Sequence, residues 1–177
     1  MTTNYSEKSY NKETMARALG KSLPISFKQS IEICSLIRNK DVNYAKKVLN
    51  GAISLTTPIP FRRFNMNMGH KKNIMSGRYP KKTSTEILKL IDCVEANAQF
   101  KGLNTANLVI THINANKASK VTHFGRKRSR DAKRTNVEIV VREKAAGRNA
   151  EKKTEKKKTE TKKKTLKEDK NKKQKND

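Results

Sequence analysis

Acidic residues are scarce in this chain of 177 residues. Only 16 Asp and Glu side chains oppose 42 Lys and Arg side chains, which leaves a formal net charge of +26. A charge of this size destabilises a compact state through self-repulsion. The composition therefore indicates a polyanionic partner, either nucleic acid or an anionic membrane surface.

Features that a membrane protein needs are missing. The sequence has no tryptophan, only 5% aromatic residues and no run of 18 or more apolar residues. It offers neither a bilayer-spanning segment nor interfacial aromatic anchors. The first 20 residues, MTTNYSEKSYNKETMARALG, lack the apolar core of a signal peptide. We therefore expect a cytoplasmic protein that binds nucleic acid and no membrane.

Cysteine and histidine are also few. The two cysteines, Cys34 and Cys93, lie in helix-like apolar patterns, so we predict that both are reduced core residues. His70, His112 and His123 are scattered and do not pair with the cysteines at metal-ligand spacing. Phosphate-loop, zinc-protease and serine-hydrolase motifs are absent from the sequence. We expect no metal, no cofactor and no catalytic site, and therefore no enzyme.

Apolar residues make up 33% of the chain, against roughly 45–50% in an average globular protein. The segment 151–177 holds 13 lysines, 6 acids and one apolar residue, Leu166, so it cannot bury a core. The other 150 residues still carry +19, which is the difference between +26 and the +7 of this segment. We predict a flexible extension over 1–14, a folded domain over 15–145 and a disordered Lys-rich tail over 146–177.

Three stretches show helical periodicity. Ser26 and Gln29 form a capping-box pattern at the start of the first helix, and Asp41 is the predicted N-cap of the second. Thr83 with Glu86 makes another capping box, followed by an apolar stripe that a Lys-Gly pair closes. The apolar stripes are Phe27, Ile31, Cys34 and Ile37 in the first helix, and Ile87, Leu90, Ile91, Val94 and Ala98 in the third.

Alternating patterns over 108–115 and 137–142 predict two strands, which a short strand around 16–23 joins. In the first of these strands, Val109, Thr111, Ile113 and Ala115 alternate with Leu108, Ile110, His112 and Asn114. The sequence thus predicts an α+β fold with three helices packed on a small antiparallel sheet.

The first basic segment is PFRRFNMNMGHKKNIMSGRYPKK, residues 60–82, with seven Lys or Arg and no acid. A loop of this length without periodicity of its own is usually functional. Its aromatics Phe61, Phe64 and Tyr79 either stack on unpaired bases or anchor the loop in the core. The candidate RNA-binding residues here are Arg62, Arg63, His70, Lys71, Lys72, Arg78, Lys81 and Lys82.

The second basic segment, residues 116–134, lies between two predicted strands and contains eight Lys or Arg and one acid, Asp131. If strand pairing continues, each arm extends roughly 35 Å over roughly 11 residues. Such a ribbon has no apolar face and is not stable alone in water, whereas RNA neutralises it along its length. The alternative is a disordered basic loop. The candidate RNA-binding residues are Lys117, Lys120, Arg126, Lys127, Arg128, Arg130, Lys133 and Arg134.

The order of the motifs PFRRF, GRYPKK, VEANAQFKGL, LVITHINANKA and NVEIVV resembles one family over about residues 15–143. It is the universal large-subunit ribosomal protein family numbered twenty-two in bacteria and seventeen in eukaryotes, in its archaeal and eukaryotic branch. The resemblance implies a protruding basic β-hairpin at about 116–138. It also implies binding to 23S-type rRNA and support of subunit assembly.

In this family the hairpin lines the polypeptide exit tunnel. Carried onto this chain, the resemblance implies tunnel-lining roles for His123, Phe124, Gly125, Arg126, Lys127 and Arg128. The implied partners are large-subunit rRNA, neighbouring ribosomal proteins and the nascent polypeptide, and the implied location is the cytoplasmic ribosome.

Two other functions fit part of the sequence. A free, histone-like protein that compacts nucleic acid accounts equally well for the net charge, but it leaves the two long basic segments without a role. An RNA-modifying enzyme requires a cofactor or acid–base site that the sequence lacks.

Overall fold

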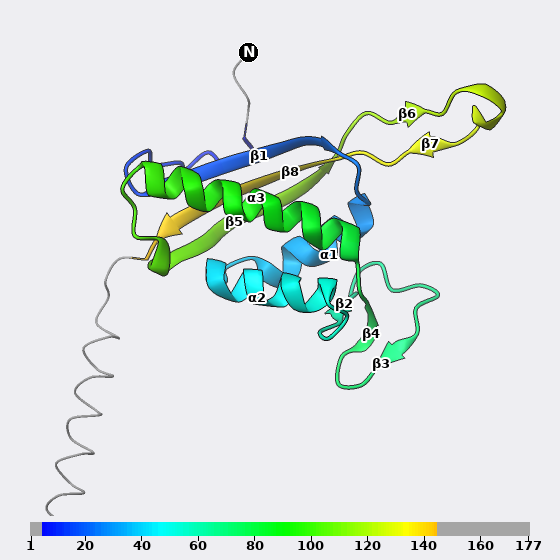
Figure 1. Cartoon of the computed structure of the whole chain (residues 1–177), viewed down its shortest axis with the longest axis horizontal. Coiled ribbons are helices and arrows are strands. Elements are labelled where there is room, and N and C mark those ends of the chain that lie inside the picture. Colours follow the sequence, from blue (N-terminus) through cyan, green and yellow to red (C-terminus); the bar gives the residue numbers. More distant parts are fainter. Residues whose placement is uncertain (1–4, 145–177) are drawn as a thin grey trace, which may run out of the picture. The chain divides into compact units, whose positions relative to one another are not determined.

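An antiparallel sheet with three helices on one face forms the body of the structure, a computed structural model that describes residues 5–144 (Figure 1). The α+β fold class is confirmed. The elements are β1 (Met15–Leu23), α1 (Phe27–Ile37), α2 (Val42–Ile53), β2 (Ile59–Pro60), β3 (His70–Lys71), β4 (Met75–Arg78), α3 (Lys81–Phe100), β5 (Leu108–Lys117), β6 (Val121–Thr122), β7 (Asp131–Ala132) and β8 (Thr135–Glu143). Two single helical turns, Thr105–Asn107 and Gly125–Lys127, complete them.

Strand β8 lies in the centre of the main sheet, between β1 and β5, and pairs antiparallel with both. Ile139 lies opposite Ala18 on β1 and Ile113 on β5, and all three side chains are buried. Successive side chains on a strand point to opposite faces, so Val137 and Val141 join Ile139 on the helix-covered face. These residues form the middle of the hydrophobic core.

A β-bulge in β5 changes which side chains face the core. The pairing with β8 shifts register between Ile110 and His112, so Thr111 is an extra residue in the strand. Thr111 donates its hydroxyl to the carbonyl of Val140 at 3.2 Å. The simple alternation expected for this strand is therefore wrong, because the buried set is Leu108, Ile110, Ile113 and Ala115.

The predicted helices are all present, but both capping boxes are wrong. Ser26 precedes α1 without donating or accepting a side-chain cap bond, and α3 begins at Lys81, after Pro80, rather than at Thr83. Thr83 instead donates its hydroxyl to Oε1 of Gln29 at 2.9 Å. The two residues meet because α1 and α3 pack together, and this tertiary contact replaces both local caps.

The predicted end of α3 is confirmed at its Lys-Gly pair. Gly102 has φ of +75° and follows the helix, a left-handed conformation that glycine adopts without strain. The two cysteines differ. Cys34 is buried as predicted, whereas Cys93 is exposed, because it lies beside the apolar stripe of α3 rather than on it.

The basic segment 60–82 has secondary structure of its own, which the sequence pattern did not reveal. Strand β4 pairs with β2 on one side and with β3 on the other, so three short strands form a second sheet. Phe61 anchors this segment in the core with only 3% of its surface exposed. Among residues 5–144, no helix is long and apolar enough to cross a membrane.

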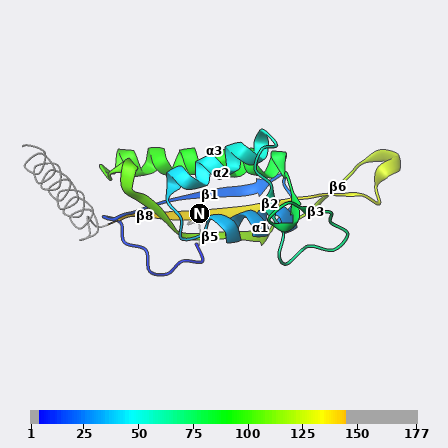
Figure 2. The same ribbon diagram turned by 90° about the horizontal axis from the view of Figure 1, so that it is seen from below.

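Residues 5–14 lie against the face of the main sheet that the helices leave uncovered (Figure 2). The Arg17 guanidinium stacks on the rings of Tyr5 and Tyr10, at 4.4 Å from each centroid. Lys101 donates its ammonium to the hydroxyl of Tyr10 at 2.6 Å and to the carbonyl of Met15 at 2.9 Å. The predicted flexibility of the extension stays a prediction, and residues 1–4 and 145–177 lie outside the described part.

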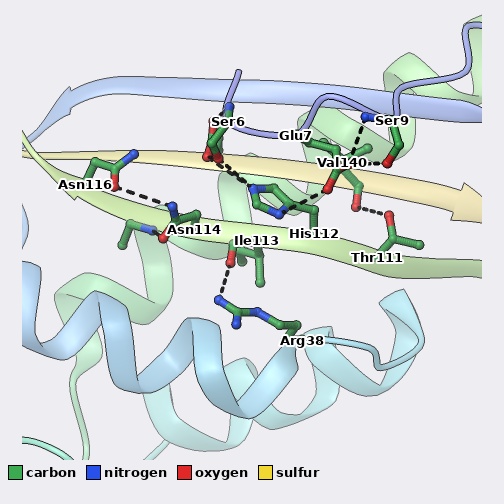
Figure 3. Close-up of polar contacts among 12 residues, drawn as sticks. Ser6, Glu7, Ser9, Arg38, Thr111, His112, Ile113, Asn114, Asn116 and Val140 are labelled. Atoms are coloured by element: carbon green, nitrogen blue, oxygen red, sulfur yellow. Dashed lines mark hydrogen bonds and ion pairs between the residues drawn. The ribbon is translucent and has the colours of Figure 1, made fainter. Parts of the chain in front are cut away.

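A buried carboxylate, Glu138, ties this segment to the sheet beside His112. Figure 3 shows Ser6 of the segment facing His112 on β5. Ser6 donates its backbone amide to Glu138 at 3.0 Å and also its hydroxyl, and His112 lies 3.1 Å from the same carboxylate. His112 also lies 3.5 Å from Glu7. Burial by itself raises the pKa of Glu138, but the hydrogen bonds from Ser6 and His112 outweigh it and hold the pKa below its usual value.

Truncation at the centre of the sheet is expected to destabilise the fold. Ile139→Ala removes a fully buried side chain, and the free energy of unfolding should fall by about 2–5 kcal/mol. Urea unfolding of the full chain, followed by circular dichroism, measures the change. Val121→Ala on the exposed ribbon is the control and should change stability by less than about 0.5 kcal/mol. Equal losses in the two variants would contradict the assigned core.

The lowered pKa of Glu138 predicts acid sensitivity. A carboxyl whose folded pKa lies below its unfolded value stabilises the fold above the unfolded value, and this contribution disappears as the pH falls through the folded pKa. The contribution should be about 1.5–3 kcal/mol, as for hydrogen bonds to a charged group. Urea unfolding of the wild type and Glu138→Gln at pH 7 and pH 3 tests this. The variant should lose less stability between the two pH values, and parallel losses would refute the assignment.

Candidate nucleic-acid interface

The segment between β5 and β8 forms a two-stranded ribbon that extends past the helices (Figure 1). Pairing in the main sheet ends at Lys117 and Thr135 and resumes where β6 pairs with β7. Backbone bonds between Ala118 and Arg134 (3.2 Å) and between His123 and Arg130 (2.9 Å) join the arms. The predicted hairpin is therefore present, and the disordered-loop alternative does not describe the structure.

The ribbon presents its charge to solvent on both faces. Among its described side chains, Lys117, Lys120, Arg126, Arg128, Arg130 and Lys133 are exposed, and Arg134 is half-buried. Lys120 pairs with Asp131 across the two arms at 3.0 Å. The remaining cations are available to an anionic partner over the length of the ribbon.

The tip of the ribbon contains all six residues for which the resemblance implied a tunnel-lining role. Gly125 has φ of +68° and begins the single helical turn that reverses the chain. His123 and Arg126 are exposed, and 93% of the Phe124 surface is open to solvent. The ring of Phe124 therefore adds an exposed apolar surface to the cations of the tip.

The basic loop after β2 is held in place by a buried carboxylate. Glu32 on α1 accepts the backbone amides of Arg62 at 3.1 Å, of Arg63 at 2.9 Å and of Phe64 at 2.8 Å. Burial of a carboxylate is costly unless hydrogen bonds satisfy it, and here three amides do so. The turn is thereby fixed, with the side chains of Arg62 and Arg63 exposed to solvent.

The two basic segments, distant in the sequence, meet at the beginning of α1. A cavity of about 330 Å³ lies between α1, the loop after β2 and the ribbon base, and a second of about 380 Å³ lies between α1 and the ribbon. Ser26, Lys28 and Lys133 line both cavities. Arg63 and Arg78 belong to the first, so basic side chains continue from the loop to the ribbon.

Other predicted RNA-binding residues lie apart from this junction. His70, Lys71, Lys72, Lys81 and Lys82 are exposed on β3, on the turn after it and at the start of α3, and they line neither of these two cavities. The arginines of the ribbon tip line neither of them. Arg62 lines neither of them either, so the junction contains only part of the predicted residues.

Sequence reasoning missed two residues of this surface. Lys28 was not a candidate, although its place two residues after Ser26 on the polar side of the first helix was a usable signal. Glu32 was not a candidate either, and the amide of Arg62 that it accepts is 30 residues distant in the sequence. No local pattern predicts such a contact.

The described residues offer little reactive chemistry. No group of three or more His, Cys, Asp or Glu in residues 5–144 is placed to hold a metal ion. Burial raises the pKa of the Cys34 thiol to about 12, so it is a protonated core residue rather than a nucleophile. What the described residues gather on this surface is positive charge, which suits electrostatic binding.

Removing the charge of Glu32 should loosen the basic loop. Glu32→Gln replaces a carboxylate that accepts three amides by a neutral group with one acceptor oxygen, which should cost about 1–3 kcal/mol of unfolding free energy. Hydrogen exchange at the amides of residues 62–64 should accelerate. Glu86→Gln is the matched control, because Glu86 pairs with Lys89 on the surface. Unchanged exchange at these amides in Glu32→Gln would show that the carboxylate does not order the loop.

Comparisons with known protein sequences identify a family and relatives of this chain. The family model described as "Ribosomal protein L22p/L17e" matches residues 18–142. The large ribosomal subunit protein uL22 of Archaeoglobus fulgidus is 37% identical over 145 residues, which cover 77% of this chain and 94% of that protein. The proteins of the same name from Staphylothermus marinus and Methanoculleus marisnigri are 38% and 39% identical. They match 80% and 75% of this chain, and 98% and 92% of their own lengths. With this coverage and these matches, the chain belongs to the ribosomal protein L22p/L17e family.

Proposed function

We propose that this chain is a structural constituent of the large ribosomal subunit that binds large-subunit rRNA through the two basic segments. Its relatives are named as proteins of that subunit, and membership of a ribosomal protein family makes it a part of the cytoplasmic ribosome rather than an enzyme. The observation that carries the proposal is the meeting of both basic segments at Lys28 and Lys133. One protein surface thereby engages two parts of a folded RNA.

The ribbon supports the same proposal. Its arms have no apolar face to bury, and the partly buried residues there are small or lie at its base. A two-stranded ribbon of this kind is marginally stable in water at best, so a partner that surrounds it must supply the missing contacts. A-form RNA is recognised by shape, backbone and irregular loops, and a folded RNA has cavities that accept a ribbon.

The tip of the ribbon is proposed to line the polypeptide exit tunnel. It is the part of the ribbon farthest along the chain from the core strands, and it combines exposed cations with the exposed ring of Phe124. By the same proposal, the folded body stays outside and contacts neighbouring ribosomal proteins. Binding of several rRNA segments by body and ribbon together would support assembly of the subunit.

Replacing the ribbon should separate binding from folding. Lys117 and Thr135 are directly paired, so an Asn-Gly turn between them can replace residues 118–134. The unfolding free energy should stay within about 0.5 kcal/mol of the wild type, because the removed side chains lie outside the core. The slope of log K against log salt for binding to large-subunit rRNA should decrease in magnitude by several units, since each phosphate contact contributes about 0.7–0.9.

Two outcomes would contradict this proposal separately. An unchanged salt slope means that the ribbon does not contact rRNA phosphates. Large subunits assembled with the shortened chain should show a loss of density at the tunnel wall in an electron microscopy map. If that density persists, the tunnel-lining assignment is wrong even where rRNA binding holds.

A further inference from the structure

Part of the lining of the cavity between α1 and the loop after β2 is apolar. Phe61, Phe64, Met66 and Met68 line it, and 86% of the Met66 surface is exposed to solvent. Its volume of about 330 Å³ lies within the range of small-ligand sites. Flexible methionine side chains beside an aromatic ring suit contact with a flat apolar group of a partner.

All the charged residues at the rim of this cavity are basic. Lys28 comes from α1, Arg63 from the loop, Arg78 from β4 and Lys133 from the ribbon base, and no acid lines the cavity. Four elements thus direct positive charge to one place. Gln29 adds a side-chain amide, whose oxygen accepts a hydrogen bond from the Thr83 hydroxyl. The ligand therefore has an anionic part at the rim and a flat, hydrogen-bonding part inside.

Phe64 is the ring that is placed to act as a stacking platform. Its backbone amide is fixed by Glu32, and the cations of Lys28 and Arg63 lie 5.6 Å and 5.5 Å from its ring centroid. Phe61 is buried and serves the core, while Tyr79 is paired with Lys71 at 5.6 Å and does not line the cavity. The two roles that the sequence left open for the aromatics are thus divided among different residues.

We propose that this cavity binds one unstacked nucleotide of the rRNA, with its base on Phe64 and its flanking phosphates at the basic rim. This inference rests on the proposed function and adds the class of RNA feature that the site selects. A base in a continuous duplex is stacked on both sides and cannot enter, so the site selects a bulged or looped nucleotide. An acidic peptide matches the rim but offers no flat group for the apolar wall.

The test compares two RNA probes on the full chain. The first is a single-stranded ten-residue oligouridylate, and the second is a ten-base-pair RNA duplex. In spectra with labelled methionine methyl groups, the single strand should shift the signals of Met66 and Met68, and the duplex should leave them in place. Equal shifts with both probes would overturn the proposal.

The variants isolate stacking from charge. Phe64→Leu keeps apolar bulk but removes the ring, and it should lower the affinity for the single strand by about 5- to 100-fold while leaving the salt slope unchanged. Phe64→Trp keeps a ring and should bind within about threefold of the wild type. Duplex affinity should stay the same in both variants, and circular dichroism confirms that each is folded.

The result also separates this inference from the proposed function. If Phe64→Leu binds the single strand as tightly as the wild type while ribbon removal still reduces the salt slope, the nucleotide site fails and the rRNA-binding function stands. If the wild type shows no salt-dependent affinity for rRNA, the function itself fails. A ten-residue polyglutamate at equal concentration serves as a competitor. If it displaces the single strand and reverses the shifts of the methionine signals, the ligand is an acidic peptide and the nucleotide site is overturned.

Discussion

The pairing of β5 with β8 is the interaction on which the rest of the structure depends. In the middle of this ladder, Ile113 and Ile139 lie side by side in the core, and beyond its Lys117–Thr135 end the same two strands continue as the ribbon. Since the ribbon buries little, its direction is determined where it begins. There the buried hydroxyl of Thr135 donates to the carbonyl of Ile25 at 3.0 Å. The core therefore provides the stability and sets the direction of the ribbon, although the ribbon itself adds little buried surface to the core.

Several acids of the described part serve the fold, whereas Asp131 pairs with Lys120 on the ribbon. Glu32 orders the loop and Glu138 holds the N-terminal segment, each by accepting backbone amides. Between α2 and α3, Lys46 pairs with Asp92 at 2.7 Å and with Glu95. Burial by itself lowers the pKa of Lys46, but these two carboxylates outweigh burial and raise the pKa. Because these carboxylates are engaged with the fold, the charge of the loop and the ribbon stays available to RNA.

Sequence periodicity predicted those parts of the fold that local physics determines. The three helices, the strands of the main sheet and the stop at Gly102 follow from apolar spacing or backbone freedom. Apart from Cys93, which lies beside the apolar stripe of its own helix, the errors involve partners distant in the sequence. The bulge at Thr111 depends on pairing with β8. Gln29 and Thr83 do not form the predicted caps, because the packing of α1 on α3 brings their side chains together. For the same reason the basic residues were predictable as a set, whereas their junction at Lys28 was not.

This difference between composition and geometry also governs recognition. Net charge gives affinity for any polyanion, and its salt-dependent part carries no information about sequence or shape. Selectivity must therefore come from features that a simple polyanion cannot satisfy. In the proposed function, the ribbon requires a partner that contacts both of its faces, and the proposed nucleotide site beside Phe64 requires an unstacked base. A compacted duplex would provide neither and a folded rRNA would provide both, so the arrangement of the charges favours the ribosome where their number alone does not.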